Sequence, residues 1–132
     1  LTYSLESIVA EKLDAIITLM NMTGRMKDFY DIYYLAINYN FEGNHLQKAI
    51  YQTLSNRKRV FDENSITDIG ILIDDNEFLL RWEDFCKGVL RFDLSFESVA
   101  YLIIDFLSSP YNAIIAKRVF LKKWDNKHRT YY

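Results

Sequence analysis

The stretch LESIVAEKLDAIITLM, residues 5–20, decides how the rest of the chain folds. Its apolar residues recur at intervals of three and four, which is the stripe of an amphipathic helix. Lys12 lies inside that stripe, about 40° from both Ile8 and Ile16 on a helical wheel, whereas Glu11 points the other way. The sequence therefore predicts a helix that carries a lysine on its buried face.

A second stretch, RMKDFYD at residues 25–31, opens another predicted helix that runs to about residue 39. Arg25 and Asp28 lie on the apolar face of this helix. Asp31 lies at the edge of the same face, and Lys27 points away from it. Two carboxylates and one arginine thus also fall where apolar side chains are expected.

Only residues 21–24 separate the two predicted helices. Because so short a link makes the helices antiparallel neighbours, Lys12 comes within reach of Asp31 and of Asp28. An unpaired charge between two packed helices is costly, so these groups must be paired, hydrated or open to a cleft.

Two interpretations of this group stay open on the residues alone. In the first, Lys12 contacts a phosphate and the carboxylates of Asp28 and Asp31 position the reacting groups. In the second, the same three residues form an ion-pair network that locks two helices together, and periodicity alone favours this one. Arg25 is then a structural partner of Asp28, and Lys27 is a solvated surface charge.

The remaining sequence predicts further helices with short connections. Residues 60–73 are the hardest to assign. Residues 69–73 within them fit either a short strand or a last helical turn, and we favour the helix because no partner strand is evident. Ser109 and Pro110 fit the start of a last helix, and the chain after residue 121 is expected to fray. The fold class is thus all-α, a single domain of about six helices, over residues 5–20, 25–39, 44–55, 75–87, 95–107 and 110–121.

Composition narrows the class of protein. The chain has 132 residues, of which 50% are hydrophobic and 26% charged, as in a folded globular domain. Its one cysteine, Cys86, excludes an internal disulfide framework and is expected to be a buried apolar group. His45 and His128 have no ligand partners at zinc spacing. No apolar run approaches the roughly 18 residues of a membrane span, and no signal peptide is evident, so a cytoplasmic protein without membrane contact is expected.

Positive charge is concentrated at the end of the chain, and negative charge in the stretch before it. Residues 62–116 hold three Lys or Arg against eleven Asp or Glu, whereas residues 117–132 hold six against one. Basic residues mixed with aromatic ones are able to grip an RNA backbone and stack on bases, although a solvated terminal helix is the commoner explanation. The residues concerned are Lys117, Arg118, Lys122, Lys123, Lys127 and Arg129, with Trp124, Tyr131 and Tyr132.

Several stretches carry a recognisable pattern: YSLE at 3–6, AEKLDA at 10–15, RMKDFYD at 25–31, residues 49–57 and WEDF at 82–85. Together they resemble the AbiEii/AbiGii nucleotidyltransferase toxins, in the C-terminal half of that family. The resemblance covers roughly residues 1–109 and leaves 110–132 as a last helix and basic tail. The combination A-E-K-x-x-A followed by R-x-K-D-x-x-D is its specific part. Ser4 stands where the family usually has Pro.

The resemblance implies a set of roles. In that family an N-terminal nucleotidyltransferase core binds the metal and nucleotide, and the helical half completes the active site with Lys and Asp motifs. Lys12, Asp28 and Asp31 would then be catalytic, and Arg25 and Lys27 would bind substrate, with no metal ligand in this chain. Mg²⁺ and a nucleoside triphosphate are implied for the complete enzyme. A cognate antitoxin is an implied partner, and tRNA is a candidate acceptor that the basic tail would contact.

The N-terminal core has no counterpart in these 132 residues, because no G-[GS] turn followed by D-x-D is present. The chain also begins at Leu1, so we expect a piece of a longer protein. The first hypothesis is therefore the C-terminal helical part of a bacterial abortive-infection or toxin–antitoxin nucleotidyltransferase, inactive as this fragment alone. It would transfer nucleotides to an RNA or protein acceptor when joined to its core. The alternative is a non-catalytic helical module, or a degenerate remnant, that binds an antitoxin.

Overall fold

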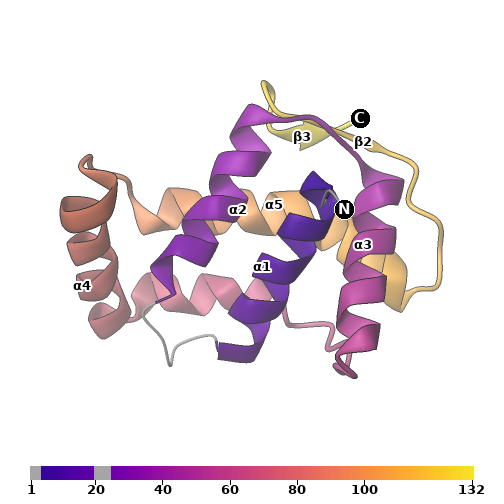
Figure 1. Ribbon diagram of the computed structural model, residues 1–132, viewed down its shortest axis with the longest axis horizontal. Helices are drawn as coiled ribbons and strands as arrows, with labels where there is room; N and C mark the ends of the chain where they lie inside the picture. The colour runs from indigo at the N-terminus through magenta and orange to yellow at the C-terminus, as the bar shows by residue number, and fades with distance from the viewer. Residues whose placement is uncertain (1–3, 20–24) are drawn as a thin grey trace.

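The computed structural model describes residues 4–19 and 25–132 (Figure 1). The predicted helical fold is confirmed: the chain is a mostly helical single domain, to which a small three-stranded sheet is added. In chain order the elements are α1 (Leu5–Leu19), α2 (Met26–Asn38), β1 (Phe41–Glu42), α3 (Gly43–Asn56), the 3₁₀-helix η1 (Thr67–Asp74), α4 (Asn76–Phe85), the π-helix η2 (Cys86–Leu90), α5 (Phe96–Ile115), β2 (Lys123–Asp125) and β3 (Thr130–Tyr131).

Helix α5 is the central support of the domain. It crosses behind α1 and α2 in Figure 1, and its residues Val99, Ile103 and Phe106 are fully buried. Helix α1 packs against both α2 and α3, and Val9, Leu13 and Ile16 of its apolar stripe are buried, as the sequence predicts. By length and composition α5 is also able to cross a membrane, but half of the relevant window is buried inside the domain, as in the core helix of a globular protein.

The boundary predicted at Ser109 and Pro110 is wrong, because α5 runs through both residues. A proline inside a helix lacks the N–H that would bond the carbonyl four residues earlier. Here that carbonyl belongs to Phe106, and the hydroxyl of Tyr131 donates to it instead. The break is therefore repaired by the C-terminal segment, and one long helix replaces the two expected short ones.

The C-terminal segment does not fray as expected. Strand β2 lies between β1 and β3 in an antiparallel sheet, with Trp124 paired to Phe41 on one side and to Tyr131 on the other. Trp124 is completely buried, and its indole Nε1 donates to the carbonyl oxygen of Ala36 at 2.8 Å. Gly43 allows the close approach, because a Cβ there would lie 2.2 Å from the carbonyl oxygen of Lys122. The tail is thus part of the core.

The segment that periodicity left ambiguous is helical, as favoured, in the form of η1. Asp75 then caps α4 by accepting a hydrogen bond from the amide of Phe78 at 3.1 Å. The helix predicted over residues 75–87 divides into α4 and the π-turn η2. Ser95 caps α5 by accepting a hydrogen bond from the amide of Ser98 at 3.3 Å.

Candidate functional site

Three of the predicted site residues meet between α1 and α2. The Nζ of Lys12 lies 3.0 Å from Oδ1 of Asp28 and 3.2 Å from Oδ2 of Asp31. Lys12 comes from the middle of α1, whereas both carboxylates come from the first turns of α2. The sequence-based prediction that helical phase brings these three side chains together is confirmed.

Two further cations stand at the outer side of the same carboxylates. Nη1 of Arg25 lies 3.1 Å from Oδ2 of Asp28, and Nζ of Lys27 lies 2.9 Å from Oδ2 of Asp31. Both pairs follow from helical spacings of three and four residues. Lys27 points toward solvent, as predicted, yet it still reaches Asp31. We call these five residues the α1–α2 charge cluster.

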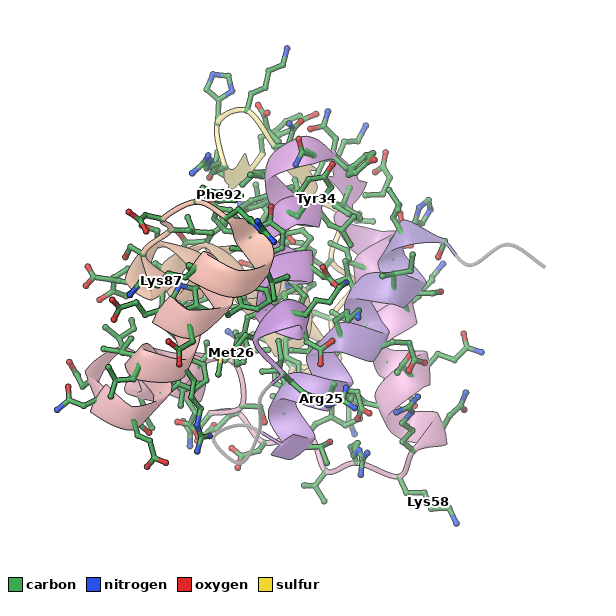
Figure 2. All side chains as sticks on the ribbon, turned by 60° about the vertical axis from the view of Figure 1, so that its left-hand side comes forward. Arg25, Met26, Tyr34, Lys58, Lys87 and Phe92 are labelled. Atoms are coloured by element: carbon green, nitrogen blue, oxygen red, sulfur yellow. The ribbon has the colours of Figure 1, made fainter. Side chains whose placement is uncertain are left out.

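The side chains of the cluster differ in solvent exposure, from the buried Asp28 to the exposed Arg25 and Lys27. The Asp28 side chain is only 7% exposed and the Lys12 side chain 30%, while Arg25 and Lys27 lie at the surface (Figure 2 labels Arg25). Burial by itself would lower the pKa of Lys12, but the hydrogen bonds and charges of Asp28 and Asp31 outweigh it and raise that pKa. Lys12 therefore carries its charge at neutral pH. Three cations against two carboxylates leave an excess positive charge that suits a phosphate.

These two helical stretches lie within a larger match to a known family. A family model described as nucleotidyl transferase AbiEii toxin, type IV toxin–antitoxin system, matches residues 1–123. The chain belongs to the AbiEii toxin family. The match extends past the range 1–109 of the sequence-based resemblance, through α5 to the start of β2. Comparisons with curated proteins and with solved structures found no match.

Membership of the AbiEii family places the chain in a toxin–antitoxin system with a nucleotidyltransferase-type role, and it implies an antitoxin as partner. The family generally uses Mg²⁺ and a nucleoside triphosphate. Within residues 4–19 and 25–132, no group of three or more His, Cys, Asp or Glu side chains could hold a metal ion. Asp28 and Asp31 already face Lys12 and their outer cations. The α1–α2 charge cluster thus does not fit Mg²⁺.

Sequence reasoning missed a second charge network on the opposite face of α1. Asp14 is 1% exposed, and its carboxylate is held by Nη1 of Arg57 at 2.6 Å and by Nε of Arg59 at 2.7 Å. Arg57 also pairs with Glu11. Burial alone would raise the pKa of Asp14, but the two arginines outweigh that effect and lower it.

A signal for this network was present in the sequence. Glu11 and Asp14 share one face of α1 at a spacing of three residues, and Arg57 and Arg59 follow the end of α3. The packing of α3 against that face of α1 could not be predicted from the sequence. The network joins α1 to the end of α3 on the side of α1 that faces away from Lys12. It therefore helps to hold α1, and with it Lys12, against α2.

The remaining chemically interesting side chains serve the fold. Cys86 is buried, as predicted, and burial raises the pKa of its thiol, which disfavours a reactive thiolate. Trp124 and Tyr131 were candidate stacking residues of the basic tail, and the structure corrects this. Trp124 is in the core, and Tyr131 packs against it with ring centroids 5.1 Å apart. The Trp124 ring is therefore not available for stacking on a base, and Tyr131 is partly buried.

Proposed function

We propose that this chain is the C-terminal helical part of a nucleotidyltransferase toxin, and that its α1–α2 charge cluster contributes to nucleotide transfer. The observation that carries the proposal is the convergence of Lys12, Asp28 and Asp31, which come from two stretches inside the family match. The chain acts with a nucleotidyltransferase core that precedes it, in the cytoplasm of a bacterium.

The proposed reaction is a displacement at the α-phosphorus of a nucleoside triphosphate. A hydroxyl of an RNA or protein acceptor forms the new O–P bond, the bond to the β-phosphate oxygen breaks, and pyrophosphate leaves. The acceptor proton passes to a base or to water. Such reactions depend mainly on positioning and on stabilising the charge of the phosphoryl oxygens.

Each residue of the cluster has a part in this scheme. Lys12 contacts a phosphate oxygen, and its charge is secured by its raised pKa. Asp28 and Asp31 hold the Lys12 ammonium in place and orient the reacting groups. Arg25 and Lys27, at the outer edge, bind the phosphates of the substrate. In the complete enzyme, Mg²⁺ would be held by residues outside this chain and would neutralise charge on the triphosphate. The test is nucleotide transfer by the chain joined to its core, with and without Lys12.

A second candidate function is supported by the closeness of the ion pairs themselves. Every charge in the cluster has an opposite charge within 3.2 Å, which is also what a purely structural lock would show. In that case the chain is a non-catalytic module, or a remnant, that binds an antitoxin. Apolar replacements of buried ion pairs are often neutral or stabilising when the network serves only folding.

The two functions predict different behaviour of apolar variants. If the cluster is a catalytic site, Lys12→Met combined with Asp28→Leu abolishes transfer whatever happens to stability. If it is only a lock, the double variant keeps the chain's free energy of unfolding within about 1 kcal/mol of wild type, or increases it, and leaves growth arrest and antitoxin binding unchanged. Chemical denaturation together with a growth assay measures both. Unchanged arrest in a folded double variant would favour the lock.

The basic tail is a proposed contact for tRNA. Its exposed cations and Tyr132, which is 69% exposed, are available, although Lys123 is engaged by Glu42 at 3.6 Å. Replacing Lys122 and Lys127 by Gln should weaken tRNA binding and reduce the slope of log affinity against log salt by about 1 to 2. Filter binding at several salt concentrations measures this. Lys58→Gln, an exposed position just after α3, is the matched control, and an unchanged slope would remove the tail from the RNA surface.

A further inference from the structure

A group of aromatic rings lies beside the α1–α2 charge cluster on α2 and extends about one helical turn beyond it. Tyr30 and Tyr34 lie on α2 with ring centroids 6.2 Å apart, and Tyr30 also meets Phe92 at 6.3 Å in an edge-to-face arrangement. Tyr34 is 46% exposed and Phe92 50% exposed. Figure 2 shows Tyr34 and Phe92 toward one end of the view, with Arg25 toward the other end of α2. We call these three residues the aromatic platform.

The platform is tied to the cluster by helical geometry. Tyr34 follows Asp31 by three residues, so the two side chains are neighbours on one face of α2, about 5–6 Å apart at their Cβ atoms. Tyr30 directly precedes Asp31. A ligand whose phosphate contacts Lys12 and Lys27 would therefore extend along α2 onto the rings.

The backbone before Phe92 leaves its helix through a π-turn and a left-handed residue. Cys86–Leu90 forms a π-helical turn, a feature that often accompanies functional sites. Arg91 then adopts a left-handed conformation with φ of 64°, which costs free energy for a residue other than glycine, and its amide donates to the carbonyl of Cys86 at 2.7 Å. This exit from the helix places Phe92 against Tyr30.

The surroundings of Phe92 favour an anionic aromatic ligand over an apolar one. Phe92 lines a pocket together with Lys87, Arg91 and Asp93. Lys87 is paired with Glu83 at 3.2 Å. Arg91 beside the exposed rings and the positive α1–α2 charge cluster along α2 are therefore the cations that can meet the phosphate of a stacked nucleotide.

We propose that the aromatic platform stacks a nucleobase, either of the nucleoside triphosphate or of an RNA acceptor. This inference rests on the proposed function, because the phosphate position is the one assigned to Lys12. The shared ligand chemistry is a purine or pyrimidine ring joined to phosphate. Tyr34 and Phe92 supply the exposed ring faces, and Tyr30 contacts both of these rings.

The test is an NMR titration of the 132-residue chain with three probes: inorganic tripolyphosphate, ATP and the single-stranded RNA pentaadenylate. Either base-containing probe should bind more tightly than tripolyphosphate, with upfield ring-current shifts of the adenine protons. Phe92→Ala or Tyr34→Ala should weaken that binding roughly five- to a hundred-fold and leave tripolyphosphate binding unchanged. Phe92→Trp should preserve it. Tyr51→Ala, another exposed tyrosine, which stacks on Phe61, is the matched control.

The outcomes separate the sources and the two proposals. A gain with ATP assigns the stacked base to the nucleotide donor, and a gain with pentaadenylate alone assigns it to the acceptor. If neither base-containing probe binds more tightly than tripolyphosphate, or if Phe92→Ala leaves their affinities unchanged, the stacking inference is wrong. The proposed function fails separately, if Lys12→Ala leaves tripolyphosphate binding intact.

Discussion

Replacing Lys12 by Ala in the complete toxin should lower the rate of nucleotide transfer at least about a hundred-fold, and Asp28→Asn should do the same. Removing one positioned group that stabilises charge in a transition state typically costs a factor of 10² to 10³. Lys12 is the only one of the five cluster residues that comes from α1, and it meets both carboxylates. Transfer of labelled nucleotide to RNA and growth arrest in cells are the two measurements.

Loss of folding must be separated from loss of chemistry in these variants. Lys12→Gln keeps a hydrogen-bonding side chain of similar length but no charge, so it should retain the fold while still losing transfer. Lys48→Ala and Asp68→Asn change exposed charges outside the cluster and should keep full activity. Thermal unfolding of every variant accompanies the assay. Full transfer and full growth arrest in folded Lys12→Ala and Asp28→Asn would show that the site assignment is wrong.

Removing both arginines that face Asp14 should destabilise the domain by about 3 kcal/mol or more. The Asp14 side chain is 2% exposed, so Arg57→Ala with Arg59→Ala leaves a buried carboxylate without a counter-charge. Such unpaired buried charges typically cost 3–5 kcal/mol. The partial exposure of both arginines lets water take some of their place, which favours the lower end of that range. Urea denaturation monitored by tryptophan fluorescence measures the loss.

Two further variants show whether the charge is the cause. Lys58→Gln lies between the two arginines and is exposed, so it should change stability by less than about 0.5 kcal/mol. Adding Asp14→Asn to the double arginine variant should recover part of the lost stability, because the buried charge disappears. A double arginine variant within 1 kcal/mol of wild type would show that the network contributes little.

Lowering the pH should reduce the difference in unfolding free energy between the wild type and the double arginine variant. In the wild type the pKa of Asp14 is lowered on folding, so its stabilisation is present above the unfolded pKa, near 3.9, and is lost as pH falls through the folded value. Without the arginines, burial raises that pKa, and protonation relieves the variant as pH falls from neutral. Denaturation curves between pH 7 and pH 4 should therefore converge. A constant gap would assign the loss to packing.

Much of the α1–α2 charge cluster was predictable because it depends on local rules. The phase of two amphipathic helices places Lys12, Asp28 and Asp31 on facing sides, and a four-residue link sets their order. The cations Arg25 and Lys27 follow from spacings within one helix. Their chemical role, by contrast, came from the family resemblance, since periodicity alone favoured a structural network.

The C-terminal segment shows where local rules fail. Pro110 and the many charges after residue 116 predicted a helix start and a frayed end. The hydroxyl of Tyr131 instead satisfies the Phe106 carbonyl that the proline leaves free, and Trp124 bonds to Ala36, 88 residues earlier. No periodic pattern encodes a contact over such a distance, so the sequence had no signal for the small sheet.

The sequence by itself determined that the chain is helical and that a lysine and two aspartates converge, because both depend on side-chain spacing within neighbouring helices. Only the tertiary structure decided what surrounds that convergence. Arg57 reaches Asp14 across 43 residues, and Phe92 reaches Tyr30 by way of a π-turn and a left-handed residue. These contacts depend on how whole helices pack, since burial and charge pairing between distant elements are settled only when the core closes.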